Sequence, residues 1–266
     1  RLLEASSACG LALPLNREFG RGTAHRKARS YFSYGQVVYR GPQVLLFGRW
    51  HIDRRNAMLW DDYDLEGVLE AARVTAQPVQ AAARTSPGSG ISSMQMLTAL
   101  RGGVLVPWHK QEAERPKSAL DLLRYDQGGL VYQPTTGLHS NVGEVDFISM
   151  YPSIMVHANI SPETTRSESE PSTDQPPGLI PRTLEPLLNK RIALKQRLAE
   201  MAADDPLRPL YQVRASAHKW LLVTCFGYLG YKNARFGRIE SHEAVTNGGR
   251  EALLAAKEAA EGQGFE

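Results

Sequence analysis

A single carboxylate ends an apolar run at the start of residues 146–164, DFISMYPSIMVHANISPET. In the preceding VGEVDF, Glu144 and Asp146 alternate with Val145 and Phe147. This alternation predicts a strand that presents both carboxylates on one face. Asp146 stands at the end of that strand, where a side chain is free to meet a ligand.

The residues after the acid predict a turn into a short helix. Pro152 suits the first turn of a helix, and Asn159 suits a helix end. An acid beside exposed turn amides can hold a hard cation while the N–H groups meet phosphate oxygens. The alternative is a surface acid before a turn, which is the commoner fate of an Asp.

Basic residues follow at helical spacing. Arg191 and Lys195 stand four residues apart, on one face of a predicted helix, where like charges repel unless an anion lies between them. Lys219 lies on the next predicted helix, at a depth from which it can reach the same anion. A triphosphate needs such point charges and a guanidinium fork. Lys190 and Arg197 nearby leave open a solvated basic face, and spacing alone does not decide between the two.

The elements that would position these residues are mostly helices. Residues 184–201 and 207–226 are predicted to form an antiparallel helical hairpin, because only AADDP joins them. The other predicted helices cover residues 64–83 with a break at Pro78, residues 91–103, and an Ala-rich stretch at 242–264 with a glycine stop.

Strands are predicted in two places. Residues 31–53 alternate β-formers around a Gly-Pro turn, which predicts a hairpin or sheet edge. Residues 128–148 are predicted to form two strands around a turn at 134–137. The Pro-rich polar stretch 167–178 is expected to be an exposed loop.

Length and composition set broad limits. The chain has 266 residues, of which 42% are hydrophobic and 22% charged, and this suits one large or two ordinary domains. The net charge of +3 is too small to identify a partner. Cys9 and Cys225 are too few for a disulfide framework, and no apolar run approaches a membrane span, so we expect a cytoplasmic protein. Because the chain opens on Arg1 and ends inside a helix-to-strand passage, we expect a fragment of a longer protein.

Four segments, in order over roughly residues 125–266, resemble motifs of the family B DNA polymerases. DFISMYPSI resembles motif A, and LLNKRIALK is similar to the first fingers helix. KWLLVTCFGYLGYKNARFG resembles motif B, a Lys followed after three residues by Asn-Ser-any-Tyr-Gly. YDQGGLVYQP resembles the Tyr-Gly-Gly motif between the exonuclease and polymerase modules, with one extra residue. A match to one motif is modest support, whereas four in order are strong.

The resemblance assigns roles residue by residue. It makes Asp146 the catalytic carboxylate and a ligand of the Mg²⁺ pair, and Tyr151 the ring under the sugar that excludes a ribose 2′-OH. Backbone amides of Ser149 and Met150 would meet the incoming triphosphate. The other nucleotide contacts that it implies are Arg191, Lys195, Lys219, Val223 and Phe226. The DNA contacts that it implies are Tyr125, Gly128, Gly129, Gly227, Lys232 and Arg235.

The fold implied is α/β (α+β), a polymerase palm sheet with an antiparallel helical-hairpin fingers subdomain, preceded by part of an RNase H-like exonuclease-type domain. Its expected divisions are 1–120, the end of the exonuclease-like domain and connector; 121–165, palm with motif A; 166–236, fingers with motif B; and 237–266, a palm helix.

The function implied is template-directed DNA synthesis, in which a primer 3′-OH attacks a deoxynucleotide α-phosphate by two-metal chemistry. Primer–template DNA and deoxynucleoside triphosphates are the expected partners, with no membrane, and a nucleoid association would follow in a prokaryote. The family's second catalytic acid lies in an Asp-Thr-Asp motif beyond the last residue here. The fragment alone is therefore expected to be inert.

Departures from the family pattern keep two alternatives open. Val223 and Phe226 stand where motif B has Asn and Tyr, which favours altered fidelity or rate, ordinary core packing of the pair, or an inactive DNA-binding subunit. The N-terminal part suggests an RNase H-like nuclease. However, Gly67 stands where the last exonuclease motif has Asp after Tyr63, and Asp64-Leu65-Glu66 is predicted to be helix N-terminal charge.

Overall fold

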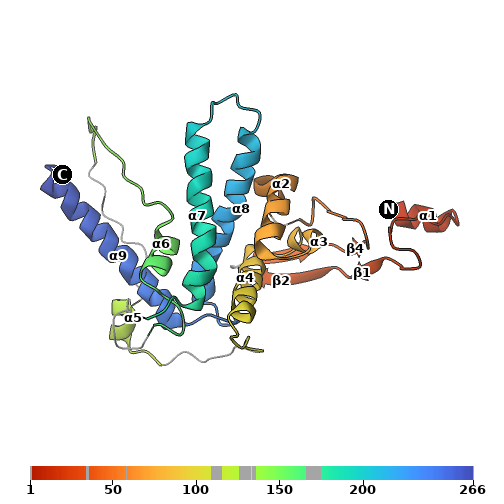
Figure 1. Cartoon of the computed structure of the whole chain (residues 1–266), viewed down its shortest axis with the longest axis horizontal. Coiled ribbons are helices and arrows are strands. Elements are labelled where there is room, and N and C mark those ends of the chain that lie inside the picture. The colour runs from red at the N-terminus through yellow and green to blue at the C-terminus, as the bar shows by residue number, and fades with distance from the viewer. Residues whose placement is uncertain are drawn as a thin grey trace.

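The computed structural model describes residues 2–33, 36–57, 59–108, 116–125, 133, 136–165 and 175–265. Two long helices stand upright at its centre, further helices pack on both sides of them, and a β-ribbon projects away from this helical body (Figure 1). The helices are α1 Leu2–Ala8, α2 Trp60–Thr75, α3 Val79–Ala82, α4 Pro87–Arg101, α5 Ala119–Tyr125, α6 Met150–His157, α7 Leu179–Glu200, α8 Arg208–Leu229 and α9 Ile239–Gly262. The strands are β1 Ala24–Arg26, β2 Arg29–Ser33, β3 Gln36–Arg40 and β4 Gln43–Leu45.

The predicted helical hairpin is confirmed as α7 and α8, which run antiparallel side by side (Figure 1). Helix α7 begins earlier than residue 184, because the turn after α6 caps it. The Asn159 side-chain oxygen accepts from Gly178 N at 2.8 Å, and the Ser161 hydroxyl accepts from Ile180 N at 3.2 Å. The Glu163 carboxylate accepts from Leu179 N. These bonds satisfy N–H groups that have no acceptor inside the helix and fix the base of the hairpin beside α6.

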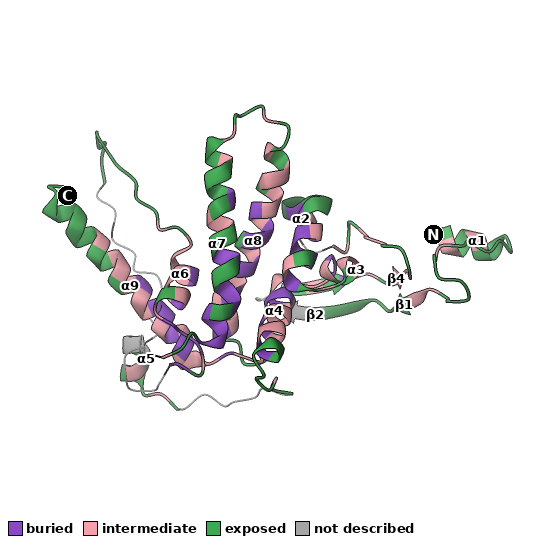
Figure 2. Cartoon of the chain, viewed as in Figure 1, coloured by how far each residue is buried: buried purple, intermediate pink, exposed green. Residues whose placement is uncertain are grey.

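One apolar core lies where the hairpin meets α4, α6 and α9. Buried faces on these helices turn toward one another, whereas the far halves of α7 and α9 are exposed (Figure 2). Burial of apolar side chains in such a core is the dominant favourable term in folding. The largest fully buried aliphatic members are Ile91, Met155, Ile160, Ile180, Leu184, Leu221, Leu222 and Leu229.

Helix α2 packs against α8, and α4 packs against α2, α7 and α8. Gly67 of α2 permits a close approach, since a Cβ there would lie 3.2 Å from the carbonyl oxygen of Val213. Helix α2 begins at Trp60, before the predicted residue 64, and kinks at Asp64, whose φ is 46°. The Asp64 carboxylate accepts from Leu65 N at 2.7 Å, so it caps the second half of the kinked helix.

The strands in the first 53 residues pair differently from the prediction. The predicted hairpin around Gly41-Pro42 is wrong: β3 pairs with β2, and β4 pairs with β1. Both pairings share one register, from Ala24↔Leu45 to Ser33↔Gln36, so the four strands form one long antiparallel ribbon. Gly41-Pro42 interrupts one arm of this ribbon. Proline has no N–H for a ladder bond, and this is why strand pairing breaks there.

The strand predicted before Asp146 is also corrected. Residues 142–147 form no strand, and most of them are exposed. Within the described ranges the only sheets are the two ribbon pairs, so neither a palm sheet nor an RNase H-like sheet is present there. Isolated strands leave backbone N–H and C=O groups without partners, and alternation in sequence does not supply a neighbouring strand. Residues 128–132 of the first predicted strand and residues 134–135 of the turn lie outside the described residues.

Candidate functional site

The short helix α6 carries the first group of predicted site residues. Asp146 is exposed, four residues before the helix begins at Met150. Ser149 is the N-cap in a left-handed conformation with φ 52°, and Pro152 lies in the first turn as predicted. The amides of Ser149, Met150 and Tyr151 precede the first intrahelical donor, so this helix start presents N–H groups to a ligand.

Three aromatic rings lie in a row at the base of the hairpin. The Tyr151 ring centroid lies 4.4 Å from that of Phe226, which in turn lies 4.2 Å from that of His242 in a stacked pair. The Tyr151 ring also rests on Gly249 of α9, where an added Cβ would lie 2.7 Å from Cε1. The predicted sugar-contacting ring is therefore held between α8 and α9.

The predicted phosphate contacts lie higher on the hairpin. Arg191 is half-buried and donates from Nη1 to the carbonyl oxygen of Ala215 at 2.7 Å, across from α7 to α8. Burial lowers the pKa of this guanidinium from its usual value. Lys195 lies one turn beyond Arg191 on α7, toward the tip of the hairpin, and Lys219 lies one turn beyond Ala215 on α8, toward its base. Both are exposed.

The spacing of the three cations follows from helix geometry. Because α7 and α8 are antiparallel and meet at Arg191 and Ala215, the Lys195 and Lys219 backbones are about 12 Å apart along the axis, at 1.5 Å per residue. Arg191 lies midway, and a lysine has a flexible four-carbon stem. Across the described part of the chain, Lys195 and Lys219 have no carboxylate partner within ion-pair distance. The arrangement can accept an extended polyanion lying along the hairpin.

An exposed stripe on α8 runs downward from Lys219. Lys219, Val223 and Gly227 follow one another at intervals of four residues, and all three are exposed. Val223 exposes 54% of its surface, so the interpretation of Val223 and Phe226 as a buried core pair is wrong for Val223. Phe226 packs against the core through the aromatic row. The Thr224 hydroxyl donates back to Trp220 O at 2.7 Å, so its hydrogen is already engaged within α8.

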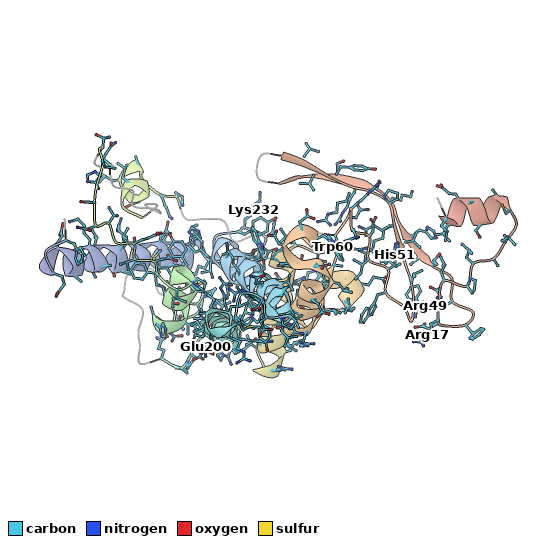
Figure 3. All side chains as sticks on the ribbon, turned by 90° about the horizontal axis from the view of Figure 1, so that it is seen from above. Arg17, Arg49, His51, Trp60, Glu200 and Lys232 are labelled. Atoms are coloured by element: carbon cyan, nitrogen blue, oxygen red, sulfur yellow. The ribbon has the colours of Figure 1, made fainter. Side chains whose placement is uncertain are left out.

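The predicted DNA contacts are less closely grouped. Lys232 is exposed at the edge of the helical body, while Trp60 and His51 lie toward the ribbon (Figure 3). Arg235 donates from Nη1 to Trp108 O at 2.9 Å and also to Pro107 O, so its guanidinium fixes the segment after α4. Tyr125 ends α5, and Gly128 and Gly129 lie outside the described residues.

A metal site would need more than Asp146. Its carboxylate is exposed, which fits a hard-cation ligand. Glu144 is exposed in the same segment. Among the side chains that the structure describes, no group of three or more His, Cys, Asp or Glu is placed to hold a metal ion. The described residues thus do not form a complete Mg²⁺ site.

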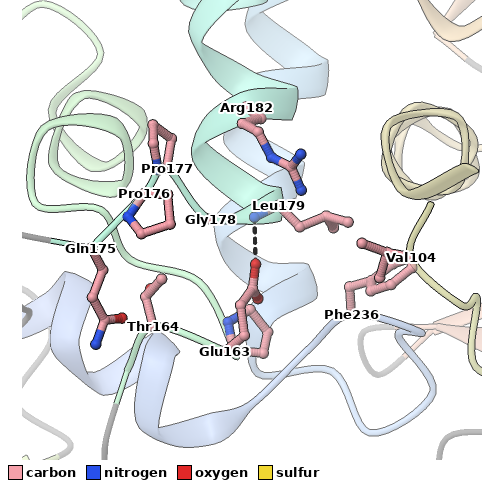
Figure 4. A pocket seen from close by; sticks show the side chains of 11 residues that line it. Val104, Glu163, Thr164, Gln175, Pro176, Pro177, Gly178, Leu179, Arg182 and Phe236 are labelled. Atoms are coloured by element: carbon pink, nitrogen blue, oxygen red, sulfur yellow. Dashed lines mark hydrogen bonds between the residues drawn. The ribbon is translucent and has the colours of Figure 1, made fainter. Parts of the chain in front are cut away.

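A pocket of about 560 Å³ lies at the start of α7 and contains none of the predicted site residues (Figure 4). Glu163 points to Leu179 N there and caps the helix. Together with the bonds from Gly178 N to Asn159 and from Ile180 N to Ser161, it occupies the N-terminal amides that would otherwise attract an anion. The candidate site is therefore not this pocket. It is the face of the hairpin that carries Arg191, Lys195 and Lys219, which we call the open side, together with the start of α6.

Sequence reasoning missed two residues that shape the site, His242 and Gly249. Both lie in a segment predicted only as an Ala-rich helix. The pair Gly248-Gly249 in the middle of α9 was a usable signal, since glycine inside a helix usually has a packing reason. A Cβ on Gly248 would lie 3.0 Å from Ile154 of α6. No sequence signal marked His242.

Comparisons with known proteins agree with the motifs. The model of DNA polymerase family B matches residues 89–266. The chain is 32% identical over 206 residues to DNA polymerase 2 of Saccharolobus solfataricus, covering 75% of this chain and 31% of that protein. It is also 32% identical over 208 residues to DNA polymerase 1 of Pyrococcus abyssi, covering 74% of this chain and 26% of that protein. The chain thus spans about a third or less of the length of these curated relatives.

The fold of this chain is also similar to part of a solved structure. The family B DNA polymerase of the hyperthermophilic archaeon Pyrobaculum calidifontis aligns with a TM-score of 0.54 and 29% identity, over 74% of this chain and 27% of that one. Within the residues described here, no helix is long and apolar enough to span a membrane. The matched family model covers more than half of the chain, and we conclude that the chain belongs to DNA polymerase family B.

Proposed function

We propose that the chain is the palm-and-fingers portion of a template-directed DNA polymerase, residues 121–165 and 237–266 contributing to the palm and residues 166–236 forming the fingers. One observation carries the proposal. Along one face of the hairpin, the Tyr151–Phe226 contact lies at the base, exposed Val223 and Lys219 lie above it on α8, and Arg191 crosses at the next level. A deoxynucleoside triphosphate lying along α8 would meet these groups in that order.

In this arrangement each residue has a distinct task. Tyr151, held between Phe226 and Gly249, would lie under the sugar and leave no room for a 2′-OH. Lys219, Arg191 and Lys195 would bind successive phosphates, with the amides at the start of α6 as further donors. Preorganised donors of this kind stabilise the charge that spreads over the phosphoryl oxygens during transfer.

Asp146 would be a ligand of the catalytic Mg²⁺. When bound, the metal pair would activate the primer 3′-OH and neutralise charge on the triphosphate. The relatives are three or more times longer than the matched region, and the second carboxylate of the site would come from outside the present sequence. The chain's own contribution would be to position the nucleotide and supply one carboxylate. By itself it would bind nucleotide and not extend a primer.

Two other functions would use the same fold differently. An inactive DNA-binding subunit is motivated by Val223 and Phe226, but it gives no reason for the Tyr151 ring held against Phe226 and Gly249 below the exposed cations. A nuclease would need the N-terminal acids to be available. Glu66 instead lies 3.7 Å from Arg214, and Asp64 caps its own helix. The polymerase accounts for more of the arrangement.

The decisive experiment replaces Asp146 with Asn in the complete protein. We expect nucleotide incorporation to fall by several orders of magnitude while the affinity for primer–template DNA stays within about twofold, because phosphate contacts supply most of that affinity. Primer extension and a duplex-binding titration measure the two quantities. Glu144→Gln is the matched control, since Glu144 is an equally exposed acid two residues away. Near-normal extension by Asp146→Asn would refute the proposal.

A further inference from the structure

A buried carboxylate lies at the junction of three helices on the other side of the hairpin. Glu70 of α2 exposes 1% of its surface. Its Oε2 accepts from Arg73 Nη1 at 2.8 Å, and its Oε1 accepts from Lys190 of α7 and from His218 Nε2 of α8, the latter at 2.8 Å. We call these four side chains the Glu70 hub. It joins three helices through a single carboxylate.

The hydrogen bonds of the Glu70 hub hold α7 and α8 in one rotation about their axes. His218 is fully buried, and its Nδ1 has no hydrogen-bond partner among the described residues. Nε2 is therefore the nitrogen that carries the hydrogen given to Glu70. Both oxygens of Glu70 are engaged, so a rotation of either α7 or α8 breaks a bond to a charge that has no access to water. Breaking such a bond is costly, since a buried charge without partners loses its compensation.

The hub residues are the immediate chain neighbours of the proposed phosphate contacts. Lys190 precedes Arg191, and His218 precedes Lys219. Successive residues in an α-helix differ by about 100° around the axis. If the hub fixes the directions of Lys190 and His218, it also fixes the faces on which Arg191 and Lys219 stand.

Apolar packing around the hub also holds α2 against α8. Ala217 of α8 is buried in a small cluster with Tyr63, Val68 and Ala71 of α2, and Trp220 packs against it. Gly67 lets α2 approach the α8 backbone. These contacts hold α2 and α8 together but do not involve α7. The hub is the described ion-pair cluster that reaches α2, α7 and α8 at once.

We infer that Glu70 is a positioning residue for the nucleotide site, because it sets the rotation of α7 and α8 and thereby aims Arg191 and Lys219 at one triphosphate. The inference rests on the proposed function. It assigns to helix α2, which contains none of the proposed nucleotide-binding residues, a role in nucleotide affinity. A deoxynucleoside triphosphate is the ligand concerned, and duplex DNA is not.

The test compares two acids on the same helix. In the complete protein, Glu70→Gln should raise the KM for deoxynucleotide between about 10-fold and 100-fold, because small misplacements of binding groups are that costly. Duplex Kd should stay unchanged, and kcat should fall less than KM rises, with rates normalised to active-site concentration. Glu66→Gln is the matched control: Glu66 also faces α8, through Arg214, but it is solvent-exposed. It should leave KM unchanged.

A second variant covers the case in which Glu70→Gln does not fold. Lys190 is 45% exposed at its side chain, so Lys190→Gln should fold and remove only the α7 arm of the hub. It should raise the nucleotide KM severalfold, whereas Arg197→Gln, also exposed on α7, should not. A merely structural role would lower the active fraction and leave KM at the wild-type value.

The outcomes distinguish a failure of the proposed function from a failure of the role of Glu70. Wild-type protein that does not bind labelled deoxynucleotide refutes the proposed function itself. Wild-type protein that binds nucleotide, with Glu70→Gln and Lys190→Gln at wild-type KM, refutes the role of Glu70 and leaves the function standing. Raised KM in both hub variants but not in the two controls supports the inference.

Discussion

The cations on the two sides of the α7–α8 hairpin differ in whether they have an acid partner. On the α2 side, Lys190 is paired with the buried Glu70, and Arg214 lies near Glu66. On the opposite, open side, Lys195 and Lys219 have no acid within ion-pair distance in the part of the chain that is described. Arg191 is bonded to a backbone carbonyl and not to a carboxylate.

We propose that this difference distinguishes charges that hold the fold from charges that are available to a ligand. Lys190 and Arg191 are adjacent in sequence and similar in chemistry, yet only one of them meets an acid. A cation whose partner is a buried carboxylate contributes to the fold through that pair. An exposed cation without an acid partner is available to an anion. The comparison predicts unequal effects of mutation on the two sides.

The largest effect on stability is expected at the hub. Glu70→Ala should lower the free energy of unfolding by about 3 kcal/mol, near the lower end of the range for breaking a buried pair, because Lys190 and Arg73 keep some contact with water. Urea denaturation followed by circular dichroism measures the change. A loss below about 0.5 kcal/mol, the usual size for a surface substitution, would mean that the hub does not hold the helices.

A smaller and reversible effect is expected with pH. The hydrogen bond from His218, with that from Lys190 and against the effect of burial, lowers the pKa of Glu70 from 4.5 to about 2. A carboxyl whose folded pKa is depressed contributes stability that is fully present above its unfolded pKa. That contribution, on the order of 3 kcal/mol at most, should be lost as pH falls from about 4.5 to about 2.

The pH effect has its own control. In Glu70→Gln no proton can bind at this position, so the unfolding free energy should fall less steeply over the same pH window than in the wild type. Unfolding titrations at intervals between about pH 5 and pH 2.5 compare the two slopes. Equal slopes would show that Glu70 is not the group whose protonation weakens the fold.

The smallest effect on stability is expected on the open side. Lys195→Ala removes an exposed cation that has no acid partner in the described structure, so the free energy of unfolding should change by less than about 0.5 kcal/mol. The same denaturation experiment measures it. A loss as large as that of Glu70→Ala would remove the distinction between the two sides.

Sequence reasoning succeeded where local patterns determine structure. Apolar spacing and short linkers predicted α7, α8 and α9, and Pro152 and Asn159 marked the two ends of α6. Each of these elements closes its own hydrogen bonds within a few residues. The order of Tyr151, Lys219 and Arg191 along the hairpin could likewise be predicted once the motifs were recognised.

It failed where structure depends on distant partners. Alternation before Asp146 predicted a strand, but pairing requires a neighbour that the described residues do not provide. The ribbon pairs β1 with β4 across 17 or more residues, which no local turn signal indicates. Glu70 and His218 are 148 residues apart. A Glu in an ordinary helical pattern gives no sign that it will be buried against a histidine from another helix.

Lys219→Ala is the sharpest test of whether the open side of the hairpin binds a nucleotide. Labelled deoxynucleoside triphosphate and labelled duplex are each titrated against wild type and mutant, with Lys232→Ala as a second exposed lysine outside the proposed phosphate site. We expect Lys219→Ala to bind nucleotide at least about tenfold more weakly and to keep nearly unchanged duplex affinity, since one phosphate contact is a small part of a salt-dependent total. Weakened duplex binding with no nucleotide binding by either protein would contradict it and indicate a DNA-binding subunit.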